Sequence, residues 1–159
     1  MKKSYQYHFV TTWRIKASIE SVWQIIYDQK LWPAWWKGVL KADTFKEGDQ
    51  NDIGKIVDYS WRSILPYTLN FKMISKKIQR PTLMEGNAFG ELEGEGKWIL
   101  EEKNGVTTAT CYWNVNTSKK WMNAFSFILK PLFEWNHNVI MKWGAKGLAK
   151  KLNATLIEY

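Results

Sequence analysis

The sequence predicts an α+β domain in which a curved antiparallel sheet of seven strands wraps around one long C-terminal helix, with short helices after the first strand. Two patterns indicate this class. Segments of alternating apolar and polar residues fill positions 5–117, and apolar residues recur at helical spacing over positions 118–153. With 159 residues, of which 45% are hydrophobic, the chain is expected to be a single domain, residues 1–159, with a core of its own.

The chain opens with a predicted strand at residues 5–16, where from Tyr7 onward every second residue is aromatic, aliphatic or threonine. A short helix is expected at 18–28, and the Ser18 hydroxyl can cap its first turn. Residues 29–38 contain three tryptophans and a proline, so a loop or a broken helical turn is predicted there.

Six further strands are predicted between the short helix and the long one. They span residues 39–46, 55–63, 67–78, 82–92, 96–102 and 107–117. Turns that contain glycine or proline separate them, and Asn104-Gly105 is the strongest hairpin signal. Because short connections join consecutive strands, we expect an antiparallel meander.

Alternation also predicts which strand residues face the helix. The expected inward set is Val57, Tyr59, Trp61, Leu69, Phe71, Met73, Met84, Gly86, Ala88, Gly90, Gly94, Gly96, Trp98, Leu100, Ala109, Cys111, Trp113 and Val115. Small residues dominate this set in the fifth and sixth strands, and Gly144 and Gly147 lie on the predicted helix. Small residues on both walls leave space, which either a closely packed helix or a bound ligand would fill.

Two polar residues interrupt the apolar face of the predicted C-terminal helix. That face consists of Leu129, Leu132, Phe133, Ile140, Trp143, Gly144, Gly147, Leu148 and Leu152. Asn136 lies at its centre and His137 at its shoulder. Since a buried amide or imidazole is costly without a hydrogen bond, both are expected to contact either another part of the protein or a ligand.

The opposite face of the same helix is polar. Glu134, Asn138, Lys142, Lys146 and Lys150 lie on it and should face water. Together with the net charge of +8, this basic face is compatible with transient contact to a membrane surface or an acidic partner. No RNA-recognition or helix-turn-helix pattern accompanies the charge, so no nucleic acid partner is expected.

Motifs for cofactor and metal chemistry are missing from the sequence. Residues 90–96, GELEGEG, lack the spacing of a nucleotide-binding loop and precede a strand rather than a helix. Two histidines and one cysteine occur without an HExxH or CxxC pattern, so no metal site and no cofactor are predicted. Cys111, in mid-strand among apolar residues, is expected to be an inert buried thiol.

The chain is expected to be cytoplasmic. Its single cysteine cannot form an internal disulfide, which fits a reducing compartment. The N-terminal lysines are not followed by the apolar region of a secretory signal. No apolar run approaches the roughly 20 residues that cross a bilayer.

Several short segments follow one another in an informative order. They are Trp13-Arg14-Ile15-Lys16-Ala17, Ser21-Val22-Trp23, Trp32-Pro33-Ala34-Trp35-Trp36, Leu65-Pro66-Tyr67, residues 90–98, and Trp135-Asn136-His137 with Met141, Gly144, Gly147 and Leu148. In this order the chain resembles the START-like (SRPBCC) superfamily, which includes polyketide cyclase/dehydrase and lipid-transport proteins, over essentially its whole length. The resemblance implies the helix-grip fold, with a hydrophobic ligand between sheet and helix. It implies no catalytic residue, because the superfamily combines carriers, cyclases and co-chaperones.

Our leading hypothesis is that a small hydrophobic or aromatic molecule, lipid- or polyketide-like, binds in a cavity between the sheet and the C-terminal helix. The predicted pocket residues are Trp13, Tyr59, Trp61, Phe71, Met84, Ala88, Trp98, Trp113, Asn136, His137, Ile140 and Met141. Asn136 and His137 would orient the polar end of the ligand, with Tyr59 as a third converging polar group.

Trp32, Trp35 and Trp36 form an aromatic cluster that could be a lid over the cavity mouth or a plug at one end of the core. Two other functions remain open. A cyclase or dehydratase could use His137 as a general acid or base near neutral pH, whereas a structural histidine would only hydrogen-bond the protein. An interaction module could instead use the basic outer helix face.

Overall fold

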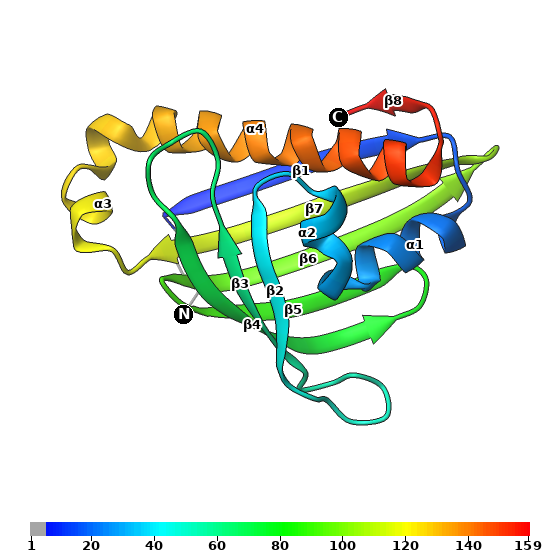
Figure 1. The fold of residues 1–159 in the computed structure, drawn as a ribbon, viewed down its shortest axis with the longest axis horizontal. Coiled ribbons are helices and arrows are strands. Elements are labelled where there is room, and N and C mark those ends of the chain that lie inside the picture. The colour runs from blue at the N-terminus through cyan, green and yellow to red at the C-terminus, as the bar shows by residue number, and fades with distance from the viewer. Residues whose placement is uncertain (1–5) are drawn as a thin grey trace.

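The computed structural model describes residues 6–159, and within them eight strands form one curved antiparallel sheet around the C-terminal helix (Figure 1). The strands are β1 (Tyr7–Ile15), β2 (Val39–Lys46), β3 (Ile56–Trp61), β4 (Leu69–Gln79), β5 (Leu83–Gly90), β6 (Leu92–Lys103), β7 (Val106–Thr117) and β8 (Leu156–Glu158). The helices are α1 (Ile19–Tyr27), the 3-10 turn η1 (Gln29–Leu31), α2 (Trp32–Trp35), α3 (Lys120–Ala124) and α4 (Ser126–Leu152). The predicted α+β class and the arrangement of a sheet around a long helix are confirmed.

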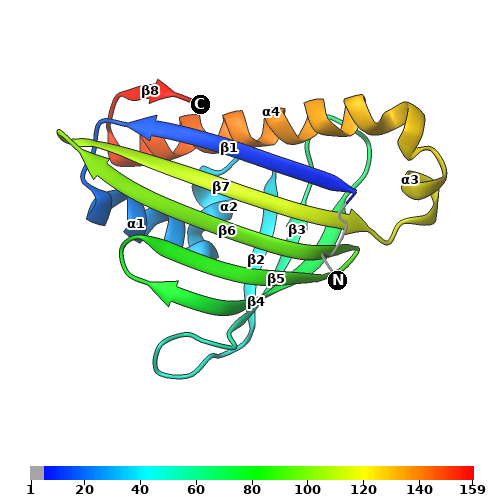
Figure 2. The ribbon, with the colours of Figure 1, turned by 180° about the vertical axis from the view of Figure 1, so that it is seen from behind.

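The strand order is β2-β3-β4-β5-β6-β7-β1-β8. From β2 to β7 the neighbours follow the sequence, as expected for a meander. β1 then pairs with β7, and Trp13 lies opposite Ala109. Figure 2 shows β1, β7 and β6 side by side, with α4 above them. The meander and this long-range pairing together produce the concave face that holds α4.

The sheet has one strand more than the seven predicted. β8 follows α4 and pairs with the free edge of β1, where Arg14 forms an ion pair of 3.6 Å with Glu158. Its three residues are only partly buried, so the alternation is too short to identify in the sequence. The predicted start of the first strand at Tyr5 lies outside the described residues.

The turn between β5 and β6 lies earlier than predicted. Gly90 has a φ of +112°, a conformation that favours glycine, and so ends β5. The Glu91 carboxylate accepts a hydrogen bond from the Asn70 backbone N–H at 2.6 Å. Leu92 is therefore free to pair with Thr117, and β6 begins there rather than at residue 96.

The predicted helix 118–153 consists of two helices. Phe125 separates α3 from α4 with φ −106° and ψ 8°, and the Ser126 hydroxyl donates to the Asn123 carbonyl at 3.0 Å. α4 ends at Asn153, whose left-handed φ of 49° turns the chain toward β8. None of the helices in residues 6–159 is long and apolar enough to cross a bilayer.

α1, η1 and α2 lie on the same side of the sheet as α4 (Figure 1). As predicted, the Ser18 hydroxyl caps α1 by accepting a hydrogen bond from the Ser21 N–H at 3.3 Å. α1 buries Val22, Trp23 and Ile26. These apolar side chains, spaced along one face, explain why so short a helix is held against the core.

Two helix glycines allow α4 to pack against the segment that contains α2. A Cβ atom at Gly144 would lie 2.4 Å from Cε2 of Trp36, and one at Gly147 would lie 2.0 Å from the Trp35 carbonyl oxygen. The Trp36 indole N–H donates to the Ile140 carbonyl at 2.9 Å. The space at these glycines is therefore occupied by the protein itself.

Candidate ligand-binding cavity

A cavity of about 210 Å³ lies between the concave face of the sheet and α4. β1, β3 to β7, α3 and α4 all contribute to its wall, and most of the lining side chains are aliphatic or aromatic. The alternation of the strands accounts for this composition, because every second side chain points toward the helix. A largely apolar wall favours an apolar occupant.

Most of the predicted pocket residues line this cavity. The ten that do so are Tyr59, Trp61, Phe71, Met84, Trp98, Trp113, Asn136, His137, Ile140 and Met141. Trp13 and Ala88 lie outside the lining. Trp13 is fully buried in the core, with its ring centroid 4.9 Å from that of Trp98 and 5.2 Å from that of Trp36. Ala88 is buried on β5, opposite Met73 of β4.

The tryptophan cluster after α1 is divided between two roles. Trp32 and Trp36 line the cavity, whereas Trp35 does not. Trp36 is almost fully buried and packs edge-on against Trp61 at 5.0 Å between ring centroids. With its N–H also held by a backbone carbonyl of α4, this ring is a fixed wall, which favours a plug over a lid.

Asn136 faces the cavity from the middle of α4 and is 9% exposed. Its side-chain NH₂ donates to the Tyr67 hydroxyl at 3.3 Å. Tyr59, the expected neighbour, instead packs between Phe71 and Trp32, with ring centroids 5.5 and 5.7 Å away. The amide is thus held by the loop before β4 rather than by β3.

His137 lies flat against Phe9 of β1. The two ring centroids are 3.8 Å apart and the planes differ by 9°. Burial disfavours the charged imidazolium and lowers the pKa of His137 to about 4. At neutral pH the ring is therefore uncharged, and it acts as a hydrogen-bonding group on the cavity wall.

Four residues that line the cavity each have a buried polar atom without a hydrogen-bond partner within residues 6–159. These atoms are Tyr7 Oη, Trp61 Nε1, Asn136 Oδ1 and His137 Nδ1. Leaving a buried polar group unpaired costs about 1–3 kcal/mol. Most buried polar atoms in proteins do have partners, and Trp13, Trp23 and Trp35, outside the lining, each have an unpaired indole N–H as well.

Several lining residues were missed by the sequence analysis. Tyr7 and Phe9 line the wall from β1, and their alternation with Trp13 was a usable signal. Phe133 lies on the predicted apolar face of the helix. Tyr67 lies two residues before Leu69 in the predicted strand 67–78, so the same alternation applied to it. In the structure it precedes β4, and its contact with Asn136 comes from the fold.

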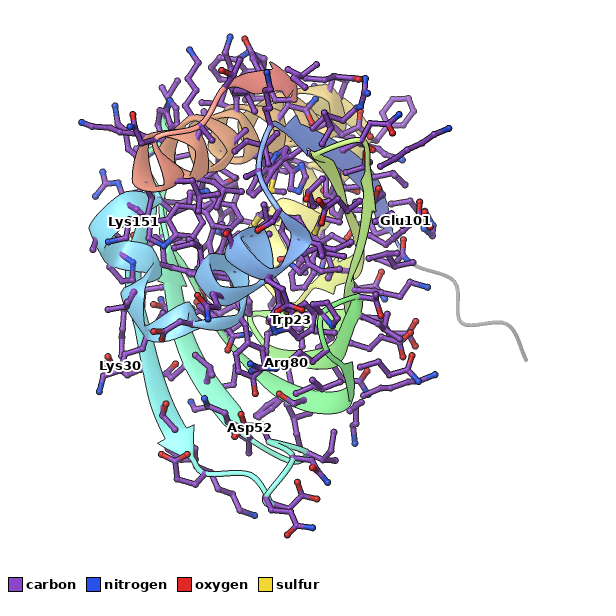
Figure 3. The ribbon with its side chains drawn as sticks, turned by 90° about the vertical axis from the view of Figure 1, so that its right-hand side faces the viewer. Trp23, Lys30, Asp52, Arg80, Glu101 and Lys151 are labelled. Atoms are coloured by element: carbon purple, nitrogen blue, oxygen red, sulfur yellow. The ribbon has the colours of Figure 1, made fainter. Side chains whose placement is uncertain are left out.

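The α1 end of the cavity is more polar. The Tyr27 hydroxyl donates to the Asp52 carboxylate, and both residues line the wall. The Arg80 guanidinium lies over the Tyr27 ring, 4.9 Å from its centroid. Figure 3 shows Trp23, Arg80 and Asp52 one below another at this end. Burial, followed by the hydrogen bond to Asp52, raises the pKa of Tyr27 to about 12, so this tyrosine remains a neutral donor.

The wall offers little covalent or metal chemistry. No group of three or more His, Cys, Asp and Glu side chains within residues 6–159 is placed to hold a metal ion. Cys111 lines the cavity, but burial raises the pKa of its thiol to about 12. A thiol of that pKa is a poor nucleophile at neutral pH.

No protein-family model and no curated protein matches the sequence. Solved structures do match the fold. A START superfamily protein from Mycobacterium smegmatis superposes with a TM-score of 0.73 at 11% identity, covering 92% of this chain and 97% of that one. The protein TTHA0849 from Thermus thermophilus gives a TM-score of 0.72 at 11% identity, over 91% and 99%. The chain has the START-like fold.

A third structure with this START-like fold is the Zhui aromatase/cyclase from a Streptomyces species. It has a TM-score of 0.66 at 11% identity, and the alignment covers 92% of this chain and 95% of that one. The START-like resemblance seen in the sequence is thus confirmed at the level of the fold. Identities this low transfer no residue roles, so the function of this START-like chain has to be argued from its own cavity.

Proposed function

We propose that the protein binds a small, mostly apolar molecule that carries one neutral polar group, in the cavity between the sheet and α4. The observation that carries this proposal is a mostly apolar cavity whose lining includes four residues that each have an unpartnered buried polar atom among the described residues. Apolar pockets with a few placed polar groups are the usual form of small-molecule sites. A ligand hydroxyl or carbonyl would supply the missing partners.

The size of the cavity favours a compact ligand. Its volume of about 210 Å³ is below the roughly 300–1,000 Å³ of typical drug-sized sites and above the ~150 Å³ that holds benzene. A molecule of one or two rings fits these limits, whereas an extended acyl or polyketide chain needs the walls to move apart. The aromatic rings of the wall favour an aromatic ligand.

The polar atoms favour an uncharged ligand. Tyr7 and Trp61 present donors, Asn136 presents an acceptor oxygen, and His137 is uncharged at neutral pH. A buried ligand charge would require an opposite charge beside it. The lining does include Asp52, Lys55, Glu85 and Lys97, but none of these is among the four residues with an unpaired polar atom. A phenol or a ketone meets these requirements without an opposite charge beside it.

The test compares two probes of equal shape. We expect purified protein to bind 2-naphthol and to gain about 5–10 °C in Tm at saturating concentration, while naphthalene gives a smaller shift. Native mass spectrometry of the purified protein would identify any molecule that already occupies the cavity. Failure of both probes to raise Tm, with no co-purifying molecule, would contradict the proposal.

Replacing Asn136 tests the polar contact directly. Asn136→Leu should weaken 2-naphthol binding about ten-fold or more and leave naphthalene binding nearly unchanged, because only the naphthol uses the amide. Thr107→Val is the matched control. Its hydroxyl is also buried and donates to the Ala17 carbonyl at 2.7 Å, but it lies outside the cavity. Equal losses for the two probes would show that Asn136 contributes only to the shape of the cavity.

A second candidate function is ring closure or dehydration of a bound polyketide-like molecule, because His137 lines the cavity and an aromatase/cyclase shares the fold. This function requires His137→Ala to abolish turnover while ligand affinity is nearly retained. A pKa of about 4 makes His137 a weak base and leaves little imidazolium at neutral pH. We therefore expect His137→Ala to change ligand affinity rather than to remove an activity.

A further inference from the structure

The outer face of α4 carries an apolar stripe that the cavity does not use. Phe125, Ile128, Leu132 and Trp135 are spaced by three and four residues, which places them on one side of the helix. Their exposed fractions are 55%, 72%, 40% and 47%. Leu132, which was expected on the buried face of the helix, therefore lies on the outer side. Phe133, by contrast, points toward the core and is buried.

Phe127 extends this apolar surface and is 96% exposed. Single exposed apolar residues are common, but five large ones within eleven positions form a patch of the kind that marks an interaction site. Figures 1 and 2 both place this start of α4, with α3, at the end of the molecule opposite α1. Trp121 of α3 packs against Tyr67 of the cavity wall, so the patch rests on an ordered base.

Lysines continue the same side of α4 beyond the stripe. Lys142, Lys146 and Lys150 follow Trp135 at 7, 11 and 15 residues, and all three are exposed. None of them forms an ion pair with another residue in the range 6–159. Across residues 120–152 there are six lysines and a single acidic residue, Glu134.

We propose that this outer face, an apolar first half followed by a basic second half, docks on an anionic phospholipid surface. Helices that lie in a membrane interface insert apolar side chains at the acyl boundary and place lysines among the headgroups. The two halves belong to one helix, which has Pro131 near its start, and they lie on the same side of it, so both can meet one surface at once. The proposal is independent of the ligand in the cavity.

The charge of the face argues against its other occupants. A second copy of the chain would bring one lysine-rich face against another, and like charges in contact are unfavourable. A nucleic acid would use the lysines but leave Phe127 and Ile128 in water. An anionic lipid surface offers acyl chains to the apolar half and negative headgroups to the basic half.

Vesicle co-sedimentation tests the apolar half. We expect the protein to bind vesicles of phosphatidylcholine with phosphatidylserine, to bind phosphatidylcholine vesicles much less, and to dissociate as salt is raised. Phe127→Ser with Ile128→Ser should weaken binding about ten-fold or more. Phe45→Ser is the control, because Phe45 is 65% exposed but lies on β2, away from α4. An equal loss in this control would overturn the proposal.

The basic half is tested with two charge reversals of equal size. Lys142→Glu with Lys146→Glu should reduce binding to the anionic vesicles at least ten-fold, since each lysine near the surface contributes to the attraction and its reversal adds repulsion. Lys76→Glu with Lys77→Glu, two exposed residues of β4, changes the net charge equally and should have a small effect. Equal effects of the two pairs would show non-specific attraction and overturn the proposal. A second result would also overturn the proposal: no binding to vesicles, together with a dimer in light scattering that Phe127→Ser converts to monomer.

Discussion

Single side chains determine what the cavity can bind. His137 is held flat by Phe9 and loses its charge to burial, and Asn136 is positioned by one hydrogen bond from its NH₂ to Tyr67. Each keeps one polar atom without a partner among the described residues. The packing of His137 on Phe9 and the hydrogen bond from Asn136 to Tyr67 thus fix the orientation of these two polar side chains.

The pKa of His137 predicts how stability depends on pH. Because its folded pKa is about 4 and its ordinary value is 6.5, the unfolded chain binds the proton more readily between these values. The contribution of neutral His137 is complete above pH ~6.5 and is lost as pH falls toward 4, amounting to about 3 kcal/mol. Urea unfolding at several pH values measures it.

Two variants distinguish the contribution of His137 to this pH dependence from that of His8. His137→Phe keeps a ring against Phe9 and should flatten the fall in stability between pH 6.5 and 4. His8→Asn, at an exposed position, should leave that fall in place. A wild-type profile unchanged by His137→Phe would show that this imidazole titrates normally in the folded protein.

At the scale of elements, the packing of α4 against the segment with α2 determines where the cavity ends. Gly144 and Gly147 allow Trp36 and Trp35 to approach the helix backbone. Trp36 in turn carries the hydrogen bond to α4 and forms part of the cavity wall. Glycines inside a helix lower its intrinsic stability. Here that cost is offset because the missing side chains allow close packing against the segment with α2.

Adding a methyl group at Gly144 should therefore destabilise the fold. In an isolated helix, alanine would be favoured over glycine by about 1 kcal/mol. Here the new Cβ would lie 2.4 Å from the Trp36 ring, so we expect Gly144→Ala to lower the free energy of unfolding by about 1–3 kcal/mol. Lys146→Ala, exposed on the same helix, should change it by less than ~0.5 kcal/mol. Chemical denaturation measures the free energy of unfolding of each variant. An increase for Gly144→Ala would contradict the close packing of Trp36 against Gly144.

At the scale of the whole molecule, the cavity runs between two unlike ends. Toward α3 it is bounded by the aromatic rings of Tyr7, Tyr67 and Phe133, with Phe133 edge to face against both tyrosines. Toward α1 it is bounded by polar groups, and the hydrogen bond from Tyr27 to Asp52 joins α1 to the loop between β2 and β3. We expect a ligand to leave at the α1 end, where fewer apolar contacts must separate.

Breaking that link should speed ligand release. Tyr27→Phe removes the hydroxyl but keeps the ring, and we expect the dissociation rate of a bound ligand to rise about ten-fold, as for loss of a hydrogen bond to a charged group. Stopped-flow displacement measures this rate. Tyr112→Phe is the control, because Tyr112 lies on β7 outside the cavity lining. No change with Tyr27→Phe would place the exit elsewhere.

The class of fold and many of the residues that line the cavity could be predicted from the sequence. Two local patterns, the alternation along the strands and the helical period over residues 118–153, placed Trp61, Trp113 and Asn136 on the inward faces, and all three line the cavity. The START-like resemblance rested on the same local segments in order. These features are predictable because each is repeated over many adjacent positions.

Which side chains contact one another could not be predicted from local sequence patterns. That Tyr67 holds Asn136, that Trp36 takes the space beside Gly144, and that β8 pairs with β1 all depend on residues far apart in the chain. Local sequence patterns do not predict such contacts, because they indicate which face a side chain is on but not which residue lies opposite it. The size of the cavity and the exposure of Phe127 are of this kind, since both depend on which space the remaining side chains fill.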